Sequence, residues 1–427
     1  MRMSVCKLVR VPFGSDSLDV LVPERNLVDV LTPDKGGASR QKESASLIEA
    51  ALDSPIASKR LLDIVSPGQK VVIVSDDITR PTPTREVLEA VVSRLNSAGV
   101  LDSDISIVMA LGSHRPMSGD ETLAKVGPGI YSRIAVYNSE FTDKSLQCRL
   151  GKADDGTEIW IDRRVASADV RVGIGSILPH PAVGWSGGGK IIYPGAAGLD
   201  TVARFHLMHG RSERNMFGMD DCPVRVAMEQ WVDLLGLDFI VNTVVRPNRE
   251  LYAAVAGHYV EAHRRGVERA KEIFGVRCSA SVDAMIASGY PTDHDFWQAT
   301  KAVLAGETAV RDGGILILLA PCEEGSGPHR NFMSDAGACS VAELLDKART
   351  GTPEEALSAS VAATLVRIRS RIDLGLVSSG ISHQVASTAG FMPFDCAQDA
   401  VNYCISTYGP DCKISMMPFG SETVIVR

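Results

Sequence analysis

The sequence lacks several features that mark common classes of protein. It has no run of lysines and arginines, and the formal net charge of its 427 residues is -8, so a basic surface for nucleic-acid phosphates is not expected. No window reaches ~18 uninterrupted apolar residues, and the N-terminus has no apolar segment of signal-peptide length. We therefore expect a cytoplasmic protein with neither a nucleic-acid nor a membrane partner.

Sequence motifs for protein-only metal sites are also missing. The nine cysteines are odd in number and form no CxxC pair, which indicates reduced thiols in the cytoplasm. Neither an HExxH motif nor a cysteine cluster is present to complete a metal site from protein ligands alone. Any bound metal is therefore expected to take most of its ligands from something other than the protein.

What the sequence does contain is an alternation of apolar strands and amphipathic helices. Residues 70–75 form a short apolar run, residues 84–99 follow a helical period, and residues 105–111 and 170–174 are again apolar. Strands alternating with helices predict an α/β fold with mostly parallel sheets. In such folds ligands bind beyond the carboxyl ends of the strands.

Length and a change of composition near residue 276 predict two domains. A chain of this length exceeds what one hydrophobic core usually supports. After this position, residues 282–287 predict a strand, residues 296–310 a helix and residues 315–320 another strand. We expect an N-terminal domain over residues 1–276, rejoined by residues 400–427.

The C-terminal α/β domain is expected over residues 277–399.

The most distinctive segment is a loop with five glycines between residues 179 and 195. A glycine run lets backbone N–H groups approach an anionic ligand closely. Gly184-x-x-x-x-Gly189-Lys190 matches most of a P-loop, but Ile191 stands where a hydroxyl is needed for magnesium. Leu178 likewise stands where a dinucleotide fingerprint needs its third glycine. An anion-binding loop is expected, while a diffusible NAD site is not.

Polar residues follow each predicted strand of the first half. Asp77 and Arg80 follow the first strand, His114 the second and His180 the third. Imidazole is a general base near neutral pH and a metal ligand, and the arginine fork holds a carboxylate or phosphate. Each residue taken alone also fits an ordinary turn, surface or core role. Together they predict a site at one edge of the sheet.

Two further groups of polar residues lie on predicted helices. His206 and His209 share one face of the helix after the glycine loop. Gln298 and Lys301 are three residues apart near the start of a later helix, where the helix dipole favours anions. With Arg80, the latter pair is expected to clamp an acid between the two domains.

These motifs together resemble the nickel-pincer-nucleotide lactate racemase family. The resemblance covers most of the chain, and several motifs in one order make it specific. The segments that carry it are Asp77-Ile78-Thr79-Arg80-Pro81, Gly112-Ser113-His114-Arg115-Pro116, Pro179-His180-Pro181, Ser186 to Gly195, His206 and Gln298-x-x-Lys301. It implies an isomerase, a racemase or epimerase of 2-hydroxy acids.

The resemblance also implies roles for single residues. Lys190 would bind the cofactor covalently, and His206 would be the protein ligand of its nickel. The cofactor is a pyridinium-3,5-bisthiocarboxylic acid mononucleotide. His114 and His180 would form the acid/base pair. Further cofactor contacts would come from Asp77, Ser186, Gly187, Gly188 and Gly189, and substrate contacts from Arg80, Trp297, Gln298 and Lys301.

The implied reaction inverts the C2 centre by proton-coupled hydride transfer to and from the cofactor, through a bound 2-keto acid. The cofactor and the substrate would lie in the cleft between the domains, and the enzymes that assemble the cofactor would be partners. Trp297 stands where the family's lactate racemases are expected to have tyrosine, so the substrate need not be lactate.

Two alternatives remain open at this level. One is a nucleotide-dependent transferase that uses the Gly184–Lys190 loop as a phosphate cradle. The other is a non-catalytic protein that binds the cofactor or a 2-hydroxy acid.

Overall fold

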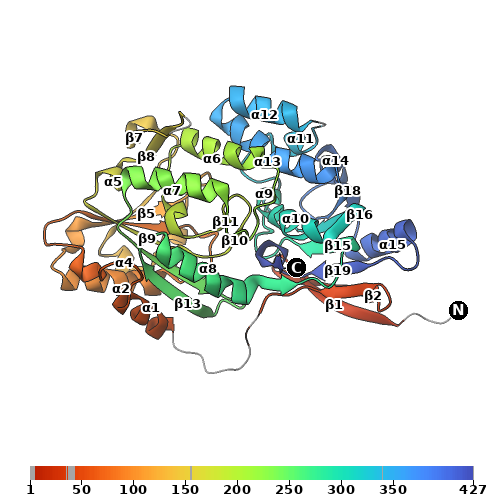
Figure 1. Ribbon diagram of the computed structural model, residues 1–427, viewed down its shortest axis with the longest axis horizontal. Helices are drawn as coiled ribbons and strands as arrows, with labels where there is room; N and C mark the ends of the chain where they lie inside the picture. Colours follow the sequence, from red (N-terminus) through yellow and green to blue (C-terminus); the bar gives the residue numbers. More distant parts are fainter. Residues whose placement is uncertain (1–4, 35, 37–43, 154–155, 339, 427) are drawn as a thin grey trace.

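The computed structural model describes residues 5–34, 36, 44–153, 156–338 and 340–426. Two six-stranded sheets with helices on both faces dominate the molecule (Figure 1). The α/β fold with mostly parallel sheets that the sequence predicts is therefore confirmed. No helix in the described ranges is both long and apolar enough to span a membrane.

The first sheet has the strand order β13-β12-β9-β4-β5-β6 and is parallel except for the β12–β13 pair. Its strands are β4 (Val71–Asp76), β5 (Ile105–Ala110), β6 (Ala135–Asn138), β9 (Val170–Ser176), β12 (Phe239–Val245) and β13 (Leu251–Gly257). Ile73 packs with α1 (Ser44–Asp53) and α2 (Thr84–Ser97) on one face, whereas Val72 and Val74 pack against the glycine loop and α7 (Pro223–Leu235) on the other. This burial on both faces explains why the strands read as continuous apolar runs.

The second sheet has the order β18-β17-β16-β15-β19-β3 and is parallel throughout. Its strands are β3 (Leu27–Val30), β15 (Val282–Ser288), β16 (Val310–Leu319), β17 (Asp373–Val377), β18 (Met392–Phe394) and β19 (Ile414–Met417). The hairpin of β1 (Cys6–Phe13) and β2 (Asp16–Pro23) packs on one face together with α15 (Ala397–Tyr408). Helices α10 (Lys301–Gly306), α11 (Phe332–Ala336) and α13 (Pro353–Arg369) pack on the other.

The remaining elements lie outside the two six-stranded sheets. They are α3 (Gly119–Val126), α4 (Pro128–Tyr131), β7 (Gln147–Lys152), β8 (Glu158–Asp162), α5 (Arg163–Ser167), β10 (Pro179–His180), β11 (Gly184–Trp185), α8 (Glu261–Phe274), α12 (Val341–Thr350) and α14 (His383–Thr388).

Helix α13 joins the two halves by packing along α6 (Leu199–Arg211), as Figure 1 shows. A Cβ atom on Gly210 would lie 2.5 Å from the Ser360 carbonyl oxygen, so the closeness of the two helices depends on this glycine. Arg367 adds a hydrogen bond of 2.9 Å to the Gly210 carbonyl. The second half of the chain therefore covers the helix that carries His206.

The expected return of residues 400–427 to the first domain is wrong for most of that segment. β19 pairs with β15 and β3, so it is an interior strand of the second sheet. The side chains of this strand are buried, and the apolar layers of the second sheet accommodate them. β20 (Val424–Val426) does lie against the first half, where it pairs with β14 (Gly275–Arg277).

The helix expected over residues 296–310 is interrupted. It consists of α9 (Phe296–Ala299), α10 and a 3₁₀ turn over Glu307–Ala309, and β16 already begins at Val310. Gln298 and Lys301 still share one side, because the Lys301 Nζ donates to the Gln298 Oε1 at 2.5 Å.

Candidate functional site

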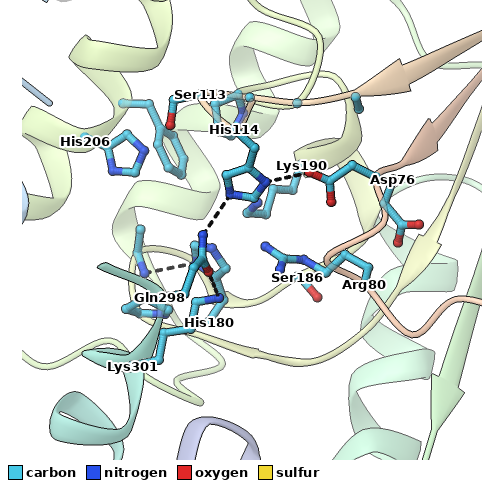
Figure 2. Close-up of a pocket in the computed structure, with 18 of the residues that line it drawn as sticks. Asp76, Arg80, Ser113, His114, His180, Ser186, Lys190, His206, Gln298 and Lys301 are labelled. Carbon is cyan, nitrogen blue, oxygen red and sulfur yellow. Dashed lines mark hydrogen bonds and ion pairs between the residues drawn. The ribbon is translucent and has the colours of Figure 1, made fainter. Parts of the chain in front are cut away.

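A pocket between the two sheets gathers the predicted site residues. All of them except Gly188 and Gly189 line it: Asp77, Arg80, His114, His180, Ser186, Gly187, Lys190, His206, Trp297, Gln298 and Lys301. The empty space among its lining residues, including the part that opens to solvent, is about 1120 Å³. Figure 2 shows His114, His180 and Lys190 in its centre.

The parallel sheet explains why these residues meet. Asp77 follows β4 directly, His114 lies four residues after the end of β5, and His180 follows β9 on the short strand β10. β4 pairs in parallel with both β5 and β9, so the carboxyl ends of all three strands lie at the same edge of the sheet. The edge predicted from the order of strands and loops is the edge that the pocket occupies.

His114 is held by a carboxylate on one side and an amide on the other. Its Nδ1 lies 2.6 Å from the Asp77 Oδ2, and its Nε2 lies 3.0 Å from the Gln298 Nε2 (Figure 2). Burial lowers the pKa of His114, and Asp77 offsets this only in part. The neutral ring therefore carries its proton on Nδ1, facing the carboxylate, and its Nε2 lone pair accepts from the amide.

Asp77 is ionised in this arrangement. Burial would raise the pKa of its carboxyl group, but the adjacent His114 ring and Arg80 outweigh burial and hold the pKa below its ordinary value. The second carboxylate oxygen accepts from the Thr79 N–H at 3.1 Å and from the Thr79 hydroxyl at 2.6 Å. Asp77 thus has a fixed orientation toward His114.

In His180 the donating and accepting ring nitrogens are exchanged relative to His114. Its Nδ1 accepts a hydrogen bond of 3.1 Å from the Ala182 N–H, which leaves the ring proton of the neutral form on Nε2. Burial lowers the pKa of His180 well below its ordinary value, and the positive charges of Lys190, Lys301 and Arg80 lower it further. One histidine of the pair is therefore set to accept a hydrogen bond through Nε2 and the other to donate one.

Lys190 is a buried amine among positive charges. Burial, followed by the charges of Arg80 and Arg225, lowers its pKa to about 7. A substantial fraction of the side chain is therefore uncharged at neutral pH, whereas an ordinary lysine is almost entirely protonated. An uncharged amine is the form that acts as a nucleophile.

The glycines before Lys190 serve packing more than ligand contact. Cβ atoms on Gly188 and Gly189 would lie 2.9 Å from the His263 ring and 2.8 Å from a Val232 methyl group, on the protein side of the loop. The Gly188 N–H donates to the Asn242 side chain at 2.7 Å, so it is not free for an anion. The close ligand approach expected at Gly188 and Gly189 is therefore not what the structure shows.

Buried polar groups hold the glycine loop in place from its protein side. The Arg225 guanidinium donates to the backbone carbonyls of Val183 and Trp185, and the His263 Nε2 lies 2.8 Å from the Ser186 carbonyl oxygen. The Ser186 hydroxyl donates to the Ser176 carbonyl at 2.6 Å and accepts from a loop N–H. These contacts hold the segment that ends in Lys190, and only a tertiary structure could identify them.

His206 is available as a metal ligand. No hydrogen bond to its ring occurs among the described residues, and its Nδ1 is buried without a partner. Burial lowers the pKa of the ring well below its ordinary value, so the imidazole is neutral, which is the form that binds metals. The one set of three close potential metal ligands in the described ranges, His294, Asp295 and Glu324, does not include it.

Trp297 borders the same region. Its ring centroid lies 6.2 Å from that of His206 and 4.3 Å from that of His329.

Asp76 and His209 are among the pocket residues to which the sequence assigned no role. Asp76 ends β4, accepts from the Thr82 hydroxyl at 2.5 Å and forms a 3.3 Å ion pair with Lys125. Its position beside Asp77 at the end of a predicted strand could have indicated that Asp76 also belongs to the site. His209 lines the pocket one turn beyond His206, as the shared helix face predicted, but the sequence gave no indication of what it contacts.

Comparisons with known proteins agree with this geometry. Residues 13–218 match the model of the lactate racemase N-terminal domain, and residues 277–426 match that of the lactate racemase C-terminal domain. The chain is 27% identical to the lactate racemase of Thermoanaerobacterium thermosaccharolyticum over 98% of its own length and 99% of the relative's. It is also 27% identical to the lactate racemase of Lactiplantibacillus plantarum, over 80% and 81% of the two chains.

Solved structures show the same fold. The lactate racemase apoprotein from T. thermosaccharolyticum superimposes with a TM-score of 0.88 at 25% identity, over 99% of this chain and all of the other. A Thermotoga maritima protein shares the fold with a TM-score of 0.69 at 19% identity, over 90% and 98% of the two chains.

Proposed function

Because the chain belongs to the lactate racemase family and is an isomerase of the racemase type, we propose that it inverts the C2 centre of a 2-hydroxy acid with a nickel-pincer nucleotide bound covalently to Lys190. The observation that carries the proposal is the shared pocket of two neutral histidines of opposite hydrogen-bonding polarity, a lysine with a lowered pKa, and the basic side chains of Arg80 and Lys301. Two acid/base groups are what inversion needs, because the hydroxyl proton of either enantiomer must be handled.

The residues present fit this cofactor. The partly uncharged Lys190 amine suits a covalent bond, and the unpartnered neutral ring of His206 suits nickel. Asp77, Ser186 and the loop over Gly187–Gly189 would border the cofactor. Gly188 and Gly189 would contribute indirectly, because their lack of side chains lets the loop pack against His263 and Val232. When bound, the cofactor would supply an acceptor for the C2 hydride, with the substrate passing through its 2-keto form.

The substrate's carboxylate is expected at Arg80, Gln298 and Lys301, beside Trp297. Arg80 provides a fork for the carboxylate, and the Lys301 amino group lies next to Gln298. Burial lowers the pKa of Lys301 well below its ordinary value, and a bound carboxylate would favour its protonated form. The hydroxyl would replace the Gln298 amide at the His114 Nε2 and pass its proton there, and Asp77 would stabilise the resulting imidazolium.

Ligand binding also prepares His180. Lys190, Lys301 and Arg80 each lower the pKa of His180 in the free protein. Attachment of the cofactor would remove the charge of Lys190, and a bound carboxylate would offset those of Lys301 and Arg80. The pKa of His180 would therefore rise when the site is filled, so that this ring can carry the proton for the opposite face.

The proposal is tested with protein produced together with the enzymes that assemble the cofactor, which we propose as its partners. In D2O it should interconvert the enantiomers of a 2-hydroxy acid while the product keeps its original C2 hydrogen, as a transferred hydride requires. Full deuteration at C2 would show proton abstraction instead. Binding without turnover would support the non-catalytic alternative, and ATP hydrolysis by an unmodified chain would support the transferase.

Asp77 acts as a positioning residue in this scheme, and its replacement separates its roles. In Asp77→Asn the amide can donate to the His114 Nδ1 and move the ring proton to Nε2, so kcat should fall ~10²-fold or more. Asp77 raises the pKa of His114, and hence the acid limb of the pH profile should move to lower pH. Chiral chromatography of reactions between pH 5 and pH 9 measures both effects.

Asp120→Asn, at an exposed position, is the matched control and should change neither quantity. If Asp77→Asn loses activity only in proportion to a loss of bound cofactor, Asp77 holds the cofactor and not His114.

A further inference from the structure

Part of the pocket is lined by three helices, and we call this part the side arm. Phe205 and His209 on α6, Leu304 on α10, and Val361 and Thr364 on α13 form its walls. Phe205 and His209 flank His206, and Leu304 lies three residues beyond Lys301. Figure 2 shows His206 across the pocket from Asp76 and Arg80, so this arm lies at the end away from those charged groups.

The side arm is uncharged. The acidic and basic side chains that line the pocket, Asp76, Asp77, Arg80, Lys190 and Lys301, belong to the strand ends, the loops that follow them and the start of α10. Arg367 is close enough to influence His209, but it donates to the Gly210 carbonyl and does not line the pocket. A carboxylate in the side arm would be buried without a cation to pair with it.

The side arm nevertheless contains polar groups without partners. The His209 side chain is among the buried residues, with 4% of its surface exposed, and no hydrogen bond to its ring occurs among the described residues. Burial lowers its pKa to about 4, so the ring is neutral and can both donate and accept. The Thr364 hydroxyl is also buried without a partner. Buried polar groups are normally satisfied, so the Thr364 hydroxyl points to a ligand atom that completes it. The His209 ring lines the same part of the pocket and is free to bond a ligand there.

We infer that the side arm binds the side chain of the substrate, and that this side chain is uncharged, larger than methyl and ends in a group that hydrogen-bonds to His209. The inference rests on the proposed function, because it places the carboxylate at Lys301 and the reacting carbon between His114 and His180. A methyl group would leave the side arm unfilled. An aromatic ring with a terminal hydroxyl matches both the apolar walls and the imidazole.

The substrate class is tested with the cofactor-loaded enzyme on lactate, 3-phenyllactate, 3-(4-hydroxyphenyl)lactate and malate. We expect kcat/KM to be highest for 3-(4-hydroxyphenyl)lactate, at least ~10-fold lower for 3-phenyllactate and lower again for lactate. Malate should be the poorest substrate because its second carboxylate would be unpaired.

Two variants test the residues. His209→Phe removes the hydrogen bond but keeps a ring, so the preference for 3-(4-hydroxyphenyl)lactate over 3-phenyllactate should fall ~10-fold. Val361→Trp narrows the side arm and should lower kcat/KM for both aryl substrates relative to lactate. His383→Phe replaces an exposed histidine outside the pocket and should leave all ratios unchanged.

The possible failures are distinguishable. If lactate is preferred and neither variant alters the ratios, the side arm does not bind the substrate. If either variant loses nickel or the covalent adduct while its melting temperature is unchanged, the side arm holds the cofactor and the inference is overturned. If the loaded enzyme racemises none of the 2-hydroxy acids, the proposed function itself fails.

Discussion

Replacing Lys190 with alanine should abolish both the covalent cofactor adduct and racemisation. The structure places this amine in a buried part of the pocket with a pKa of about 7, so it is nucleophilic at the pH of the cell. Intact-mass measurement of protein produced with the cofactor-assembly enzymes should show an adduct on the wild-type protein and none on Lys190→Ala. Activity should fall to the background, because no other residue would bind the cofactor covalently.

Lys190→Arg is the informative companion variant. It keeps a positive charge in the pocket but has no nucleophilic amine at neutral pH, so it should also lack the adduct. Lys59→Ala, at an exposed position, controls for the loss of a lysine and should retain the adduct. An adduct of unchanged mass on Lys190→Ala would remove this residue from its proposed role.

Replacing either His114 or His180 with alanine should lower kcat ~10³-fold while nickel and the covalent adduct are retained. Each ring would handle the hydroxyl proton on one side of the reacting carbon, and water in a largely buried pocket is a poor substitute. Chiral chromatography measures the rate, and metal analysis with intact mass measures cofactor loading. His383→Ala should match the unmodified protein in both.

The two histidines should also differ from each other. His114 is paired with Asp77, whereas His180 has a backbone N–H as its partner, so the pH profiles of the residual activities should not be the same. Full activity in either alanine variant would exclude that residue from proton transfer. A parallel loss of nickel would show a role in cofactor binding instead.

The site could be predicted largely from sequence because its residues occur at strand ends and in a distinctive loop. Asp77, His114 and His180 follow apolar runs that predict buried parallel strands, and the carboxyl ends of such strands share an edge. Lys190 and its glycines stand out by composition alone. Local pattern therefore indicated that the strand-end residues and Lys190 share one site, whereas Trp297 was assigned to it only through the family resemblance.

The failures have a common physical cause. Each wrong expectation depends on neighbours far away in the chain. These expectations are the sheet that β19 joins, the continuous helix over residues 296–310, and the close approach of a ligand to Gly188 and Gly189. Burial, which no local pattern measures, also sets the pKa values of Lys190 and His180.

The sequence by itself determined the α/β fold class, the residues at the strand ends and the family resemblance, because strand periodicity and loop chemistry are local. Only the tertiary structure decided the Asp77–His114 pairing, the opposite polarity of the two histidines and the packing of α13 over α6. It alone placed His209 in an uncharged side arm, because that arm is made by three helices distant in sequence. Hydrogen-bond partners and burial arise when such segments meet.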